Sequence, residues 1–161
     1  MVRGVAIPVV TIVALLVIVI GFFEGRKAYL DSQVREMCAK DGGIKVYEAV
    51  RLTDEKYAKL LDKFGRLSIP RRSSGTTNQS ADSEYYMEWK VTYIQRGNPE
   101  LSRDHFMIIR SADGKLLGES VYYGRGGGDL PGPWHESSFI CPNIGAQKSL
   151  ESSIFSREDA K

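Results

Sequence analysis

An uncharged apolar run near the N-terminus constrains this chain more than any other feature. The run extends from Val5 to Phe23 and contains no Asp, Glu, Lys or Arg. About 19 residues at about 1.5 Å each make a helix about 28 Å long, close to the roughly 30 Å thickness of a bilayer core. A helix satisfies its own backbone groups in lipid. The run therefore predicts a transmembrane helix over residues 5–23 that contacts the bilayer, after a short tail, 1–4.

Two other interpretations compete with an uncleaved anchor. A cleaved signal peptide has an apolar region of about 7–15 residues and an A-x-A-like cleavage site. The run here is longer, and the sequence GFFEGRKAYL that closes it and follows it contains no such site. A buried core helix is the second alternative, and the strong hydrophobicity of the run disfavours it. We therefore expect a signal-anchor that stays attached to the rest of the chain.

A second helix signal follows the apolar run. Apolar residues recur with the i, i+4, i+7, i+8 spacing of one helix face, at Leu30, Val34, Met37 and Cys38. This spacing is typical of an amphipathic helix. Gly42 and Gly43 come next, and glycine commonly supplies the left-handed residue that ends a helix. The pattern predicts a juxtamembrane helix over 24–43 that continues the transmembrane helix without a break.

The rest of the chain predicts one α+β domain over residues 44–155, followed by a polar tail at 156–161. Alternation of apolar and polar residues indicates strands at 44–50, at 85–95 and on both sides of the Asp113-Gly114 turn. A short helical pattern follows Thr53. The predicted fold class is therefore α+β: a transmembrane helix continuing into an amphipathic helix, then a small, mostly antiparallel sheet of about four strands with one packed helix.

The two cysteines, Cys38 and Cys141, leave two alternatives open. An even number of cysteines in an extracytoplasmic domain suggests a disulfide, and a bridge here would close a loop of about 100 residues, for which the stabilisation is large. The other alternative is a pair of buried free thiols. Lysine and arginine near the span slightly oppose a cytoplasmic N-terminus. The cysteines favour the opposite orientation, with the C-terminal domain outside.

No motif in the sequence assigns a chemical activity, a metal or a cofactor. His105 and His135 are the only histidines, and their spacing from the cysteines matches no zinc motif. The glycine-rich segment GRGGGD is followed by LPGP, which cannot open a phosphate-binding helix. Charge is nearly balanced, with 22 Lys+Arg against 20 Asp+Glu, so a nucleic-acid partner is not expected. No catalytic residue is assigned; an enzyme of unrecognised type using the His135/Glu136 region is kept as an alternative.

Aromatic residues provide the candidate binding surface. Tyr85, Trp89 and Tyr93 alternate along one predicted strand and so share a face. Such a stripe is either ordinary core packing or, if no helix covers that face, a surface for a partner or ligand. Arg125, among glycine amides that could hold an anion, and His135, in a turn-rich loop, complete the candidate surface.

One string of residues carries a resemblance. Cys-x-x-Asp-Gly-Gly-Ile-x-Val-Tyr-Glu extends from Cys38 to Glu48, and a Cys-Pro pair lies at Cys141-Pro142. With the N-terminal apolar segment, this resembles a group of small uncharacterised bacterial envelope proteins, mainly proteobacterial. The resemblance implies a bacterial envelope setting, which supports an outward C-terminal domain and paired cysteines. It implies no activity, so no catalytic residue is carried over.

Together these features predict a single-pass protein of the inner membrane with a periplasmic domain. We expect the domain to be an interaction or accessory module that contacts another membrane or envelope protein and has no catalysis of its own. A ligand-sensing module is the alternative. Within the Cys38–Glu48 string, Glu48 falls on the apolar side of its predicted strand, so the sequence predicts that its carboxylate has a specific partner.

Overall fold

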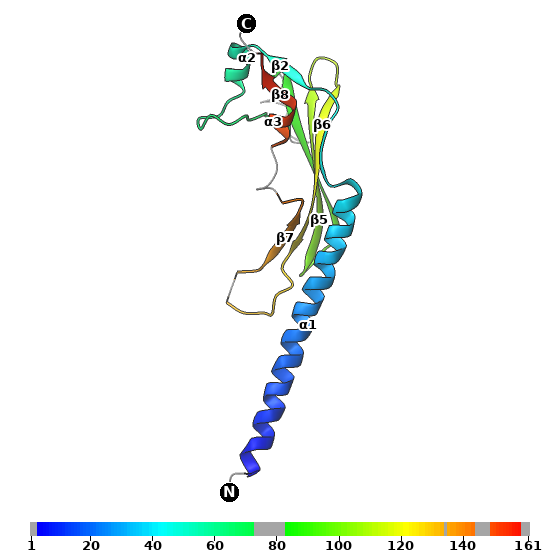
Figure 1. Cartoon of the computed structure of the whole chain (residues 1–161), viewed down its shortest axis with the longest axis vertical. Helices are drawn as coiled ribbons and strands as arrows, with labels where there is room; N and C mark the ends of the chain where they lie inside the picture. The colour runs from blue at the N-terminus through cyan, green and yellow to red at the C-terminus, as the bar shows by residue number, and fades with distance from the viewer. Residues whose placement is uncertain (1–2, 73–82, 134, 144–148, 159–161) are drawn as a thin grey trace.

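The computed structural model describes residues 3–72, 83–133, 135–143 and 149–158, with side chains from position 9 onward. Its longest element is α1 (Arg3–Asp41), a single helix of 39 residues that begins inside the predicted N-terminal tail. The N-terminal half of α1 projects away from the rest of the molecule, and its C-terminal half lies along the sheet (Figure 1).

The projecting half of α1 is compatible with a membrane anchor. From Val9 onward the helix is long and apolar enough to cross a membrane, and no residue of its most apolar 18-residue window is buried. Burying apolar surface is the main driving force of folding in water, so a core helix would not leave these side chains exposed. The interpretation as a buried core helix is therefore wrong for the described side chains.

Glycine ends α1 where the sequence predicted. The N–H of Gly42 donates to the carbonyl of Cys38 over 2.8 Å, and Gly43 has a φ of 108°, which favours glycine. A Cβ on Gly42 would lie 2.6 Å from the Cys38 carbonyl oxygen and 2.8 Å from its Sγ. The chain can therefore turn from the helix into the sheet beside Cys38 only because position 42 has no side chain.

The sheet has six strands in the order β1-β6-β5-β4-β3, with β7 pairing beside β6. Its strands are β1 (Gly43–Val46), β3 (Arg71–Arg72), β4 (Tyr85–Gln95), β5 (Glu100–Arg110), β6 (Leu116–Gly126) and β7 (Ser138–Cys141). The β3–β4 pair is parallel and the other pairs are antiparallel. A separate parallel pair, β2 (Val50–Leu52) with β8 (Phe155–Arg157), completes the strands of the described chain.

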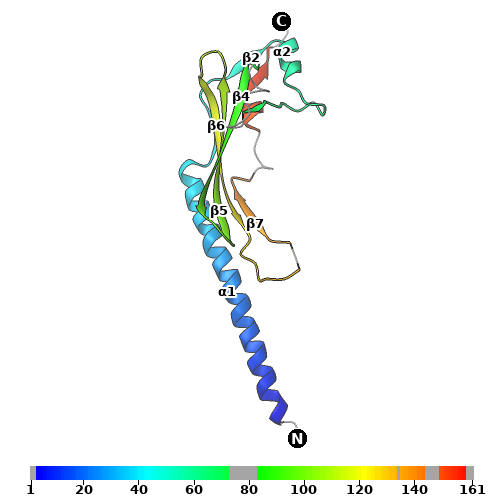
Figure 2. The same ribbon diagram turned by 180° about the vertical axis from the view of Figure 1, so that it is seen from behind.

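The two faces of the sheet are covered differently. The C-terminal half of α1 packs on one face, where Leu30, Val34 and Cys38 are buried against Val121 and Tyr123 of β6. The small helices α2 (Asp54–Lys59) and α3 (Leu150–Ile154) and the β2–β8 pair gather at the end far from the N-terminus (Figures 1 and 2). They enclose a second core with the other face of the sheet, around Ile108 and Ile154.

The predicted α+β class is confirmed, while the strand predicted at 44–50 differs. It divides into β1 and β2, which belong to different sheets. The N–H groups of both Tyr47 and Glu48 donate to the carbonyl of Leu117, over 2.8 and 3.0 Å. Two consecutive donors on one acceptor break the strand ladder, so the chain bends at this point and leaves the main sheet.

Two further boundaries differ from the predicted ones. The pattern after Thr53 predicts a helix that Gly65 stops. The helix α2 ends earlier, at Lys59, because the Asp62 carboxylate accepts the N–H groups of Phe64 and Arg66 and forms a turn instead. Strand β8 continues to Arg157, within the predicted polar tail. The last three residues of that tail lie outside the described residues.

Gly118 gives a testable measure of how closely α3 packs on the sheet. A Cβ at this position would lie 2.8 Å from Cδ1 of Ile154 and 2.9 Å from the carbonyl oxygen of Lys45. Because the backbone oxygen cannot move aside, Gly118→Ala is expected to lower the unfolding free energy by about 1–3 kcal/mol. Urea unfolding of the full chain in lipid nanodiscs would measure it.

The matched control is Gly126→Ala in the same strand. A Cβ there would meet nothing within 4 Å, so we expect a small change. Equal effects at the two positions would contradict close packing at Gly118.

Candidate functional site

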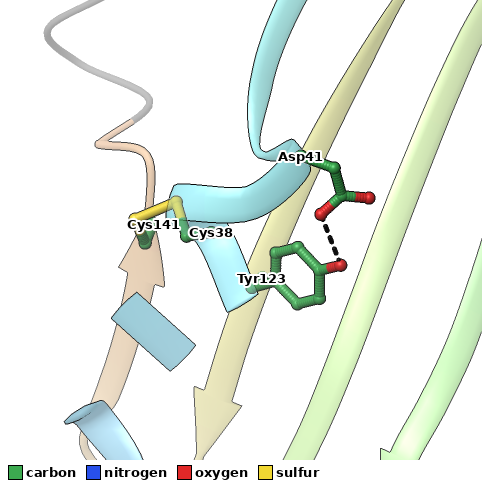
Figure 3. Close-up of a disulfide and its surroundings, with 4 residues drawn as sticks. All are labelled: Cys38, Asp41, Tyr123 and Cys141. Carbon is green, nitrogen blue, oxygen red and sulfur yellow. Dashed lines mark hydrogen bonds between the residues drawn. A yellow bond between two sulfur atoms is a disulfide. The ribbon is translucent and has the colours of Figure 1, made fainter. Parts of the chain in front are cut away.

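A disulfide joins the end of α1 to the sheet. Cys38 and Cys141 are bonded, with their Cα atoms 6.0 Å apart and a sequence separation of 103. Figure 3 shows the bond connecting the last turns of α1 to β7. The disulfide alternative is therefore confirmed over the alternative of free thiols. The two sulfurs are thereby unavailable as metal ligands beside the histidines.

A polar cluster reinforces the same corner. Asp41, the last residue of α1, accepts a hydrogen bond from the Tyr123 hydroxyl over 2.8 Å (Figure 3) and pairs with the Arg103 guanidinium over 2.8 Å. The hydrogen bonds from Arg103 and then from Tyr123 lower the pKa of the Asp41 carboxyl. Asp41 therefore links the helix end to β5 and β6.

Arg125 forms a second link between α1 and the sheet, at Asp31, which is about three helical turns closer to the N-terminus than Asp41. Its side chain is only 4% exposed, and its Nε donates to the Asp31 carboxylate over 2.6 Å. The same guanidinium also donates to the carbonyl of Gly127. Arg125 is therefore already occupied by α1 and the β6–β7 loop, and is not free to bind an anion from solution.

The β6–β7 loop is tied to α1 near the predicted end of the membrane span. Lys27 Nζ lies 2.9 Å from Asp129 Oδ1, and the Ser137 N–H donates to Asp129 Oδ2 over 2.6 Å. The Lys27 ammonium and then the Ser137 N–H hold the pKa of Asp129 down to about 2. The domain is thus fixed to the helix by an ion pair only four residues beyond Phe23.

The structure separates the three aromatic residues of the candidate surface. Tyr85 is buried in the distal core, in edge contact with Phe155 at 4.8 Å between ring centroids. Burial raises the pKa of its hydroxyl to about 12. Trp89 and Tyr93 remain 50% and 43% exposed. The packing alternative holds for Tyr85, while Trp89 and Tyr93 lie on the part of the face that the described helices leave open.

His135, Glu136 and Arg125 do not form a common site, which an enzyme using the His135/Glu136 region would need. His135 and Glu136 are both exposed, in the β6–β7 loop, and Glu136 accepts a hydrogen bond from the Asn98 amide over 2.7 Å. Arg125 points to α1 instead. Among the residues that the structure describes, no group of three or more His, Cys, Asp or Glu side chains is placed to hold a metal ion.

The open face of the sheet contains a cleft of about 510 Å³. Its apolar lining includes Met87, Phe106, Tyr122, Ile140 and Leu150. The cleft is bounded by residues of β7 on one side and by the start of α3 on the other. Figure 2 shows β7 and α1 on opposite sides of the long strands. The volume of the cleft is in the range of about 300–1,000 Å³ that is typical of small-molecule sites. We take this cleft as the candidate functional site.

Ring contacts hold the aromatic wall of the cleft in place. The Phe106 ring stacks parallel to Trp89, with centroids 5.8 Å apart, and meets Tyr122 edge-on at 6.1 Å. Trp89 Nε1 also donates to Asp104 Oδ1 over 2.9 Å. Trp89 therefore borders the cleft and orients two of the residues that line it, which connects one predicted binding residue to the site.

Besides Trp89, the sequence indicated Arg125, whose side chain binds Asp31 instead. The pattern before the Asp113-Gly114 turn predicts a strand that His105 opens, whereas β5 begins at Glu100, so Ser102 and Asp104 fell outside the predicted strand. Had β5 been extended to Glu100, alternation would have placed Ser102, Asp104 and Phe106 on one face. Alternation along β5 could thus have grouped these residues on one face. It could not have shown that this face is open, because a local pattern does not indicate which face a distant helix covers.

The predicted partner of Glu48 is present. Its carboxylate lies 2.7 Å from Arg110 Nη2 and 2.6 Å from Lys115 Nζ. Hydrogen bonding to Lys115 and the nearby Arg110 charge lower the pKa of this carboxyl. Glu48 lies in the connection between β1 and β2 rather than on an apolar strand face, so its carboxylate holds this connection against Arg110 and Lys115 at the β5–β6 turn.

Comparison with known proteins adds no assignment, since no family model, curated protein or solved structure matches the chain. The function is therefore argued from the site and the anchor alone.

Proposed function

We propose that this chain is a single-pass protein of a bacterial inner membrane whose sheet domain lies in the periplasm and serves as an interaction or accessory module without catalysis. The observation that carries the proposal is the Cys38–Cys141 disulfide in the C-terminal part of α1, the helix whose N-terminal part is apolar enough to span a membrane. Disulfides persist in oxidising compartments such as the periplasm and are rare in the cytosol. The resemblance of the Cys38–Glu48 string to envelope proteins supports the same setting.

A ligand-sensing role is the second candidate, and the cleft favours it. The cleft is concave, largely apolar and open to solvent, and it lies on the face that α1 leaves free. Sensing and accessory binding differ in what the bound molecule changes, but both require this cleft to be accessible from the periplasm. The membrane topology is therefore the first property to test.

Single added cysteines would test the topology in the chain with its disulfide intact. Ser156→Cys places a thiol on an exposed position of β8, and Gly4→Cys places one at the other end of the span. In spheroplasts, a membrane-impermeant maleimide is expected to label position 156 and to leave position 4 unlabelled until lysis. The unmodified chain is the control, and we expect no labelling of it without reductant.

The reverse result would overturn the proposal. Labelling at position 4 but not at 156 would place the domain in the cytoplasm. Labelling of the unmodified chain without reductant would show free thiols and would remove the argument for an oxidising compartment.

A further inference from the structure

Among the described residues that line the cleft, acidic side chains outnumber the cations that are free of a carboxylate partner. Glu100, Asp104 and Glu151 line it, and each is partly shielded from solvent. None of the three has an ion-pair partner among the described residues. Two described arginines also line the cleft. Arg71 forms no ion pair with a described carboxylate, and its guanidinium lies 5.7 Å from the centroid of the Trp89 ring. Arg125, which also borders the cleft, is neutralised by Asp31. An occupant that supplies positive charge would therefore complement the cleft.

Asp104 is held in position with acceptor capacity to spare. Trp89 Nε1 donates to its Oδ1 over 2.9 Å, and the Ser102 hydroxyl donates to its Oδ2 over 3.3 Å. A carboxylate has about four acceptor sites, so two bonds leave it able to accept from a ligand. The fixed orientation reduces the entropy that a ligand contact would otherwise cost.

A serine adds a neutral polar group to the lining of the cleft. Ser120 is 2% exposed and lines the cleft between Phe106 and the α3 side. Among the described residues, the buried side-chain atom without a hydrogen-bond partner is Arg110 Nε, so the Ser120 oxygen is not an unpaired atom sealed inside the protein. Ser120 offers a polar contact deep in the cleft, beside the aromatic wall.

We infer that the cleft binds a small organic cation: an amine or guanidinium attached to a flat apolar body. The apolar body would lie against Phe106 and Tyr122, and the cationic group would pair with Asp104 and its acidic neighbours. A peptide strand is disfavoured, because the floor is a sheet face whose backbone groups are already paired in the β5–β6 ladder. This inference rests on the binding role proposed above and names the class of ligand.

A charge series of one ring system would test the inference. Tryptamine is cationic, tryptophol is neutral and indole-3-acetate is anionic, while all three carry the same indole. Calorimetry on the full chain in nanodiscs of zwitterionic lipid would measure their affinities. We expect tryptamine to bind at least tenfold more tightly than tryptophol, and indole-3-acetate to bind most weakly. Added salt is expected to weaken tryptamine binding only.

Variants separate the cleft from general effects. Asp104→Asn keeps an acceptor for Trp89 and removes the charge, so it is expected to weaken tryptamine at least tenfold and to leave tryptophol unchanged. Glu88→Gln, on the opposite face of the neighbouring strand, is the matched control and should change neither. Gly124→Val fills the floor of the cleft, where a Cβ would make only ordinary contacts, and should abolish binding of every probe.

Several outcomes would overturn the inference. These are no tryptamine binding at millimolar concentration, equal affinity for the three probes, an equal loss in Asp104→Asn and Glu88→Gln, or binding of a basic peptide such as Lys-Trp-Lys in place of tryptamine. Each concerns the ligand class and is measured on purified protein. The cysteine labelling above fails or succeeds separately, so failure of the inference and failure of the proposed membrane topology can be distinguished.

Discussion

Replacing both cysteines, as Cys38→Ala with Cys141→Ala, is expected to lower the unfolding free energy by about 4–5 kcal/mol. The physical reason lies in the unfolded chain, since the bond closes a loop of 103 residues and a loop of about 100 residues loses that much conformational freedom in the chain-entropy model. Urea-dependent pulse proteolysis of the full chain in nanodiscs would measure the change. Reducing the unmodified chain should give a similar loss.

The expected loss is large for a small domain, whose total stability is commonly about 5–15 kcal/mol. The double variant is therefore expected to be unfolded in a large fraction of molecules at moderate temperature. A loss below about 1 kcal/mol would contradict this account. It would indicate that the unfolded chain already holds the helix end near β7.

Arg125→Met is expected to cost about 3–5 kcal/mol, because it leaves the Asp31 carboxylate without its cation in a mostly buried position. The Asp31 side chain is 19% exposed and the Arg125 side chain 4%. The Arg125 guanidinium also donates a hydrogen bond to the Gly127 carbonyl, and the substitution would remove this donor. The same urea and proteolysis measurement applies, and the salt dependence should be weak, since a buried pair is little screened.

Two comparisons make the Arg125 result interpretable. Arg103→Met breaks the more exposed pair with Asp41, whose side chains are 27% and 35% exposed, and should cost only about 1 kcal/mol. Arg125→Met combined with Asp31→Leu removes both charges and should recover most of the loss. If Arg125→Met costs no more than Arg103→Met, the buried pair is not the link that we describe.

Features with local signals could be predicted from the sequence. The apolar run, the i, i+4, i+7, i+8 stripe and the glycine pair each act within a few residues, and α1 follows all three. Asp113-Gly114 likewise fixes the β5–β6 turn by its own backbone preference. The sequence left it open whether the cysteines are bonded or free. The fold decides between these alternatives, because it brings together two segments that are 103 residues apart in the sequence.

Features that depend on distant partners could not be predicted in the same way. The bend at Tyr47 depends on the carbonyl of Leu117, and the pairing of β2 with β8 joins segments about a hundred residues apart. Arg125 lies in a glycine-rich stretch that reads as a flexible turn, and its partner Asp31 is 94 residues away. Alternation showed that Tyr85, Trp89 and Tyr93 share a face, but it could not show that α3 and its neighbours cover only one end of that face.

The uninterrupted helix has a consequence for how the cleft meets its ligands. In the proposed topology α1 runs from the bilayer to the sheet without a flexible linker. The Lys27–Asp129 ion pair holds the β6–β7 loop against α1 at a point about 6 Å along the helix from the end of the membrane span. A domain on a flexible linker would take up many positions relative to the membrane, whereas this domain is held at a fixed distance from the bilayer surface. Bilayer thickness changes the tilt of a spanning helix. A change in lipid composition would therefore raise or lower every cleft in the membrane together.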